Sequence, residues 1–201
     1  MWGFFMRFLA NCTPGRAHAN GNKALRLALY SRDTLRELRA ETGIGFSAED
    51  RGILHIYRSS RDLERAARVS ERFRALGLET QTINAQACAQ IEPALGPVRD
   101  QLAGAIYSPA DLSGDAHAFT SELAKYAADA GVEFRMDTKI VRIAQMGGRV
   151  TGVLTQRGMV TGNAYVCAMG SYSTPLLSDI GIKLPIYPAK GYSATVPLNE
   201  P

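Results

Sequence analysis

Cysteine and histidine are scarce in this chain of 201 residues, which contains three of each. Cys12, Cys88 and Cys167 are too few and too far apart for a disulfide framework or a zinc site. The histidines show no metal-ligand spacing, so the sequence predicts no metal site. This cysteine usage fits a reducing compartment, and we expect a cytoplasmic location.

Long hydrophobic runs are also absent, and the most apolar segment is the aromatic run from Trp2 to Leu9. It is too short to span a bilayer, and it lacks the basic start and the small-residue cleavage site of a secretory signal. Two alternatives remain: a short helix packed into a domain, or an interfacial membrane anchor. The packed helix is favoured, because short amphipathic helices are mostly core elements.

A nucleic-acid-binding motif is missing as well, although the net charge is +4. Arginines crowd the segment 26–74, but acidic residues are interspersed among them. Such mixing is typical of solvated helix faces with local ion pairs. We therefore expect no nucleic-acid partner.

The chain also lacks the strand, G-x-G-x-x-G turn and helix that receive the pyrophosphate of a dinucleotide. Gly43-Ile-Gly45-Phe-Ser-Ala48 matches the related pattern G-x-G-x-x-A, but a helix is expected before it and a strand after it. A dinucleotide-binding turn requires the reverse order, a strand before the turn and a helix after it. We interpret Gly43 as the residue that ends a helix, in the left-handed conformation that glycine adopts readily.

What is present predicts an α+β arrangement over the first half of the chain. Leucines at 25, 29, 35 and 38 indicate one helix, and apolar residues from Leu63 to Leu76 indicate another, preceded by Ser59-Ser60. Strands are predicted at Ile53–Tyr57 and Gly104–Tyr107. A short helix is expected from Asn84 to Glu92, where Pro93 stops it.

From residue 113 onward the pattern changes to a helix followed by short strands. Asp115 is a plausible N-cap, and Gly131 suits the position after the helix. The alternation of Val132, Phe134 and Met136 predicts a strand, and another is expected to begin at 139–143. Glycine pairs then divide residues 149–160 into short antiparallel strands.

The segment Ala164–Leu177 predicts a buried parallel strand, a glycine turn and a helix. Val166 to Met169 form the apolar run, which would bury Cys167 as an inert side chain, and Gly170 allows a sharp turn. Ser171, Ser173 and Thr174 could cap the helix, whose free N–H groups favour a phosphate. Many α/β proteins turn this way with nothing bound, so this segment by itself does not establish a nucleotide site.

The layout of residues 113–177 resembles the middle of FAD-dependent amine and amino-acid oxidoreductases of the glycine oxidase and D-amino acid oxidase type. Within that family the chain is similar to the small subunits of D-amino acid dehydrogenases over nearly its whole length. The strings that carry the resemblance are Met1–Cys12, Tyr30–Asp33, Leu38–Ile44, Glu92–Leu95, Gly170–Ser173 and Tyr187–Ser193.

The resemblance implies an internal portion of such an enzyme, without either end of the cofactor domain. The expected fold class is α+β / α/β: a partial FAD-binding, Rossmann-like domain with a mixed antiparallel-sheet substrate domain. Residues 1–110 would belong to the substrate domain and 111–180 to the FAD domain. Residues 181–201 would return to the substrate domain as a strand.

The implied activity is oxidation of a D-amino acid to a 2-oxo acid and ammonia, with hydride transfer to FAD. The cofactor does the difficult chemistry, so no catalytic side chain is assigned. Cofactor contacts carry over to Ile140, Ala168, Gly170 and Ser171. Lys190 and Tyr192 are candidates for the substrate carboxylate, since a cation and a phenol can hold one. A strand-edge lysine and a half-buried tyrosine are equally compatible with the sequence.

The implied partners are the D-amino acid and an electron acceptor of the respiratory chain, reached at the periphery of the inner membrane. The fragment is expected to be inactive alone. Two alternatives stay open: a noncatalytic, partner-dependent remnant, and a glycine or sarcosine oxidase that reduces oxygen.

Overall fold

The computed structural model describes residues 2–192, which separate into two compact units divided between Glu133 and Phe134. Each unit is described by itself. The assignment of 1–110, 111–180 and 181–201 to substrate and FAD domains stays a prediction. Among the described residues, no helix is both long enough and apolar enough to cross a membrane.

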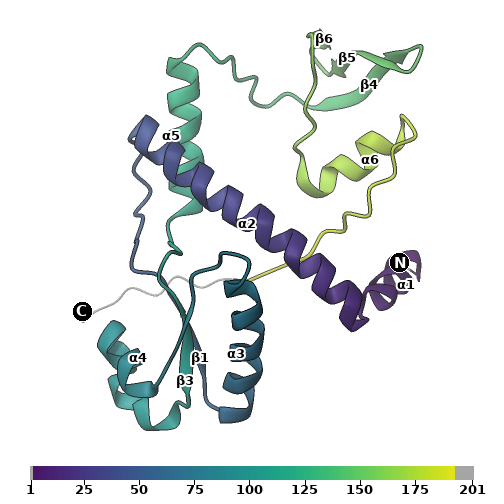
Figure 1. The fold of residues 1–201 in the computed structure, drawn as a ribbon. Helices are drawn as coiled ribbons and strands as arrows, with labels where there is room; N and C mark the ends of the chain where they lie inside the picture. Colours follow the sequence, from purple (N-terminus) through teal and green to yellow (C-terminus); the bar gives the residue numbers. More distant parts are fainter. Residues whose placement is uncertain (1, 193–201) are drawn as a thin grey trace. The chain divides into compact units, whose positions relative to one another are not determined.

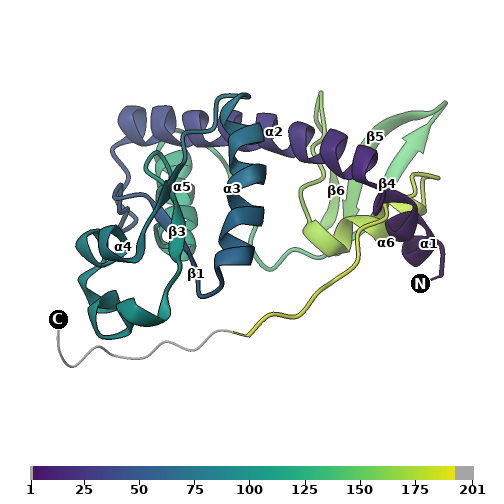
Figure 2. The ribbon, with the colours of Figure 1, turned by 60° about the horizontal axis from the view of Figure 1, so that its bottom comes forward.

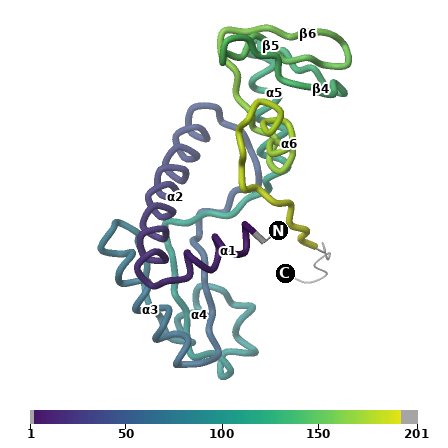
Figure 3. Tube along the Cα trace, turned by 90° about the vertical axis from the view of Figure 1, so that its right-hand side faces the viewer, coloured from purple at the N-terminus to yellow at the C-terminus, as the bar shows by residue number. Residues whose placement is uncertain are grey.

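The first unit begins with two helices, α1 (Trp2–Asn11) and α2 (Pro14–Thr42), that meet at a corner (Figure 3). Pro14 starts α2 because the first helical position needs no N–H donor. Gly43 ends it in the left-handed conformation, with φ 67°, and its N–H donates to the Arg39 carbonyl. The predicted role of Gly43 is therefore confirmed, and the helix is longer than the leucine spacing indicated.

A three-stranded antiparallel sheet lies at the centre of the first unit, in the order β1-β3-β2. Its strands are β1 (Ile53–Tyr57), β2 (Gln81–Ile83) and β3 (Gly104–Ser108). The helix α3 (Ser60–Arg74) lies on one side of β3, and α4 (Ala85–Ile91) lies on the other (Figures 1 and 2). The helical segment η1 (Pro93–Gln101) and the helix α5 (Ala116–Asp129) complete the unit.

The predicted N-cap at Asp115 is confirmed by its hydrogen bonds, and Ser59 and Asn84, which the sequence placed at helix starts, also act as caps. Ser59 Oγ accepts from Asp62 N at 3.4 Å, and Asn84 Oδ1 accepts from Ala87 N at 2.9 Å. Asp115 Oδ1 accepts from the N–H groups of His117 and Ala118, at 2.8 and 2.9 Å. Each cap satisfies donors that the first helical turn leaves without partners, which is why these local signals could be found in the sequence.

The second unit is built on a β-meander with the order β4-β5-β6. Its strands are β4 (Ile140–Met146), β5 (Arg149–Thr155) and β6 (Gly158–Val160). A single-turn helix η2 (Gly170–Tyr172) runs directly into α6 (Ser173–Ser178), which lies against β4. The predicted antiparallel strands at 139–160 are thus confirmed.

Two other predicted strands are wrong. Residues 132–136 and 166–169 form no strand, and the side chain of Val166 is 92% exposed. Cys167, expected to be buried, is exposed. A strand needs a neighbour for its N–H and C=O groups, and no described segment pairs with either of these.

The predicted capping of α6 by serine or threonine is also wrong. Tyr172 occupies the N-cap position and makes no side-chain cap. Ser173 Oγ instead accepts from Met169 N at 3.2 Å, and Thr174 Oγ1 donates to the Ile186 carbonyl at 3.2 Å. The reason is backbone geometry: η2 leads straight into α6, so Tyr172 is helical where a capping residue would be extended.

Candidate functional site

The open edge of β4 carries Ile140, the first of the sequence-predicted cofactor residues. Lys139 O accepts from Gln156 N at 3.0 Å, so the backbone groups of Lys139 point toward the neighbouring strand. Successive residues of a strand direct their backbone groups to opposite sides. The N–H and C=O of Ile140 therefore lie at the free edge of the sheet, available to a ligand.

The turn at Gly170 is the second element of the candidate cofactor site. Gly170 has φ 54°, and a Cβ placed on it would meet no heavy atom within 4 Å. The backbone conformation explains the glycine, and the space beside it is unfilled. Ser171 follows in η2 and is half-buried, and Ala168 precedes the turn and is exposed.

The structure places all four predicted cofactor residues in one unit. The helix α6 begins three residues after Gly170 and packs on the strand that Ile140 opens. The arrangement offers backbone hydrogen-bonding groups at a sheet edge and open space at a glycine turn. These features fit a ligand held largely through main-chain contacts, as the adenosine part of FAD would be.

The predicted substrate residues Lys190 and Tyr192 lie at the end of the described chain. Both are exposed, and residues 183–192 form no strand. The strand predicted to return the chain to the substrate-domain sheet continues into residues 193–196, which lie outside the described residues. Lys190 and Tyr192 share a unit with the predicted cofactor residues, and their contact with the substrate stays a prediction.

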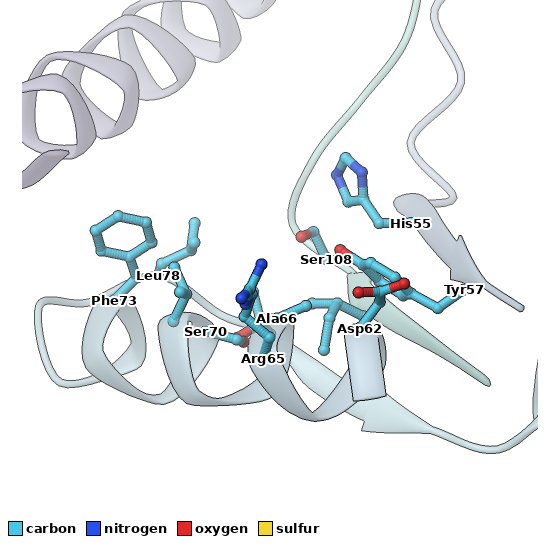
Figure 4. Close-up of a pocket in the computed structure, with 12 residues that line it drawn as sticks. His55, Tyr57, Asp62, Arg65, Ala66, Ser70, Phe73, Leu78 and Ser108 are labelled. Carbon is cyan, nitrogen blue, oxygen red and sulfur yellow. The ribbon is translucent and has the colours of Figure 1, made fainter. Parts of the chain in front are cut away.

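The first unit contains a hollow of about 570 Å³ between α3 and the strands β1 and β3 (Figure 4). The alternation of β1 directs His55 and Tyr57 to this side, and Ile106 and Ser108 come from β3. The opposite helical wall combines apolar side chains with polar and charged ones. The residues of α3 that contribute to the lining are Asp62, Arg65, Ala66, Val69, Ser70 and Phe73.

This hollow could hold an apolar side chain, with the Arg65 guanidinium and the Asp62 carboxylate available for a charged group. This hollow was not among the sites predicted from the sequence. Alternation in Ile53–Tyr57 and the three-residue spacing of Asp62 and Arg65 were visible signals. The pairing of β1 with β3, in which His55 lies opposite Ile106, was not visible because it joins residues about 50 positions apart.

Two titratable groups of the first unit have shifted pKa values. The backbone N–H groups of Ala118 and His117 lower the pKa of the Asp115 carboxyl. Burial raises the pKa of the Cys88 thiol, which has no exposed surface. Both effects belong to helix capping and core packing. Within the described chain, no group of three or more His, Cys, Asp or Glu residues is placed to hold a metal ion.

Comparison with known proteins gives a family match over residues 6–201, described as FAD dependent oxidoreductase. A D-amino acid dehydrogenase of Paramagnetospirillum magneticum is 49% identical over 200 residues, which is 100% of this chain and 47% of that protein. A D-amino acid dehydrogenase of Dechloromonas aromatica is 45% identical over 204 residues, covering 99% of this chain and 48% of that protein. The chain thus spans about half the length of these curated relatives.

Solved structures agree on the fold. Glycine oxidase from Bacillus cereus superposes with a TM-score of 0.62 and 29% identity, over 83% of this chain and 44% of that one. L-proline dehydrogenase from P. horikoshii superposes with a TM-score of 0.69 over 79% of this chain and 41% of that one. Its 22% identity supports the fold alone. The mixed helical and antiparallel-sheet architecture is that of a partial FAD-binding oxidoreductase.

Proposed function

The chain belongs to the FAD dependent oxidoreductase family, and from this premise we propose that it forms part of a D-amino acid dehydrogenase. The observation that carries the proposal is the 49% identity to a D-amino acid dehydrogenase along the entire chain. The reaction is oxidation of a D-amino acid to an imino acid, which water hydrolyses to a 2-oxo acid and ammonia. When bound, FAD supplies the acceptor for the Cα hydride.

The residues of the second unit hold the adenosine part of this cofactor in our proposal. The backbone of Ile140 contacts the adenine from the open edge of β4. Ala168, Gly170 and Ser171 lie beside the ribose and pyrophosphate, where the left-handed Gly170 keeps side-chain atoms out of the way. These contacts use main-chain groups, so they do not depend on the identity of the side chain at position 140 or 168.

Lys190 and Tyr192 bind the substrate carboxylate in this proposal. A lysine ammonium and a tyrosine hydroxyl both donate hydrogen bonds to a carboxylate, and both side chains are exposed at the end of the described chain. Holding the carboxylate orients Cα for hydride loss. In this proposal the electron acceptor is a component of the respiratory chain, and the protein lies on the cytoplasmic side of the inner membrane, in peripheral contact with it.

The proposal is tested by expressing the longest open reading frame that contains the chain. We expect a yellow protein that retains FAD and reduces a soluble dye with D-alanine but not with L-alanine. Lys190→Gln should raise the KM for D-alanine, whereas Lys183→Gln, the same change in the same segment, should not. Oxygen-dependent oxidation of glycine or sarcosine without D-alanine activity would replace the proposal with an oxidase. Absence of FAD would support a noncatalytic remnant.

The cofactor contact has its own test in Ile140→Pro. Proline removes the N–H that faces the open edge, and it is tolerated at sheet edges because that N–H makes no ladder bond. We expect the variant to keep the far-UV circular dichroism of the parent and to lose FAD more readily on dialysis. Unchanged FAD retention in a folded variant would remove Ile140 from the site.

A further inference from the structure

The helix α1 presents a half-exposed apolar face. Phe5, Phe8 and Leu9 follow the i, i+3, i+4 spacing that places residues on one side of a helix, and Met6 lies at its border. Their side chains are 47–61% exposed. Arg7 and Asn11, four residues apart, lie on the other side. The helix is amphipathic, and it was expected to be packed within a domain.

Hydrogen bonds to α2 fix the orientation of this helix. Arg16 Nη1 donates to the Ala10 carbonyl at 3.1 Å, and Asn20 Nδ2 donates to Asn11 Oδ1 at 3.2 Å. Asn11 belongs to the polar side of α1, so the polar side contacts α2. The apolar side is therefore directed away from α2.

Charge is segregated in the same region. Residues 1–32 contain five of the 23 basic residues of the chain and none of its 19 acidic residues. The remaining 169 residues consequently carry one more acidic than basic side chain, and the whole net charge of +4 originates in this segment. The basic residues are Arg7, Arg16, Lys23, Arg26 and Arg32.

Part of this charge lies on an exposed stripe of α2. Arg16, Lys23, Leu27 and Tyr30 are separated by seven, four and three residues, which places them on one side of the helix. Leu27 and Tyr30 are 67% and 70% exposed. The buried Leu25 lies on the opposite side. Cationic and amphipathic side chains thus continue outward from the corner with α1.

We infer that α1 and the N-terminal half of α2 dock on an anionic lipid bilayer. With ten residues, α1 is about 15 Å long, half of the roughly 30 Å hydrocarbon core, so it would lie in the interface with Phe5, Phe8 and Leu9 inserted. Arg16, Lys23 and Arg26 would face anionic headgroups. The inference rests on the proposed function and deepens it by locating its membrane contact. Failure of this inference would leave the proposed function standing.

The test is sedimentation of the full chain with vesicles, at low and high salt. We expect binding to phosphatidylcholine mixed with phosphatidylglycerol, and weaker binding to phosphatidylcholine alone. High salt should reduce binding to the vesicles that contain phosphatidylglycerol, because it screens the attraction between the basic side chains and the anionic headgroups. Phe5→Ser/Phe8→Ser and Lys23→Gln/Arg26→Gln should each lower the partition coefficient at least about tenfold.

Matched controls make equal changes elsewhere. Arg61→Gln/Arg68→Gln removes the same charge from exposed positions of α3, and Met136→Ser/Met146→Ser removes exposed apolar side chains from the second unit. Both should bind vesicles like the parent. If the control variants weaken vesicle binding as much as the α1 and α2 variants do, the attraction is nonspecific and the proposed docking surface is incorrect.

Two further outcomes overturn the inference. One is no vesicle binding by a folded chain. The other is a dimer in size-exclusion chromatography that Phe5→Ser/Phe8→Ser dissociates, which would show that α1 contacts a second copy. Dye reduction with D-alanine and vesicle binding, both measured on the longest open reading frame that contains the chain, separate the two proposals. Activity without vesicle binding supports the function and contradicts the docking surface, and binding without activity does the reverse.

Discussion

The ring of Phe46 packs edge-on against the ring of Phe119, with centroids 5.2 Å apart and an interplanar angle of 76°. Phe46 lies in the connection between α2 and β1, and Phe119 lies in the first turns of α5. The guanidinium of Arg39 sits 5.8 Å from the centroid of the Phe46 ring. A single buried ring thus joins the end of α2 and the connection that follows it to α5, which is distant in sequence.

Phe46→Ala should lower the free energy of unfolding of the first unit by about 3–5 kcal/mol, because Phe46 is only 5% exposed and its removal leaves a cavity. Urea unfolding followed by circular dichroism measures the change. Phe134→Ala serves as the control, since that side chain is 47% exposed. Equal effects of the two substitutions would contradict the role of the Phe46–Phe119 contact.

Gly114→Ala should also destabilise the first unit, by about 1–3 kcal/mol, because it overpacks the core instead of leaving a cavity. A Cβ at Gly114 would lie 2.5 Å from an atom of the Phe46 ring. Gly45→Ala is the matched control, because a Cβ there meets nothing within 4 Å. A thermal melt that shows no difference between the two variants would mean that Phe46 moves freely aside.

The buried hydroxyls of Ser70 and Thr80 are hydrogen-bonded to each other and join α3 to the segment before β2. Ser70→Ala or Thr80→Val should each cost about 1–3 kcal/mol, because the remaining hydroxyl loses its partner. The double variant should cost less than the sum of the two. Strict additivity in the double-mutant cycle would show that the two hydroxyls are energetically independent.

The Asp115 cap predicts a pH dependence. Its pKa is lower in the folded chain than the ordinary 3.8, so the carboxylate stabilises α5 above that pH, and the stabilisation is lost as the pH falls through the lower folded value. When the pH is lowered through this range, the urea midpoint of the parent should therefore fall more than that of Asp115→Asn. Asparagine keeps an N-cap but does not titrate. Identical pH profiles for the two proteins would exclude this role.

Gly170→Ala tests the cofactor turn against a matched glycine. Gly170 and Gly181 both have positive φ, 54° and 83°, with nothing within 4 Å of a Cβ. Alanine at either position should cost about 1–2 kcal/mol of conformational strain. Only Gly170→Ala should also weaken FAD retention in the longest reading frame, measured by flavin absorbance after dialysis. Equal losses from both variants would show that retention follows stability alone.

Local signals in the sequence were reliable for most features that depend on neighbours along the chain, and the capping of α6 is the exception. The cap at Asp115 and the helix starts at Ser59 and Asn84 could be predicted because an N-cap side chain bonds to N–H groups two or three residues ahead. Gly43 was predicted because a helix ends readily at a left-handed glycine. The strands of the β-meander follow from alternation and glycine turns within 20 residues.

Failures occurred where the structure depends on distant partners. The apolar run Val166–Met169 has the composition of a buried strand, yet composition cannot supply the neighbouring strand that would satisfy its backbone. The same applies to the alternation at 132–136. The hollow beside α3 was missed because it arises from the pairing of β1 with β3 across η1 and α4.

The sequence by itself determined the family, the cap at Asp115, the end of α2 at Gly43 and the candidate cofactor residues, because these rest on identities and spacings along the chain. The tertiary structure alone decided which strands form and which faces remain exposed. It placed Ile140 at an open sheet edge and left the apolar side of α1 directed away from α2. Strand pairing and burial depend on contacts between residues far apart in the sequence, and local pattern carries no information about their partners.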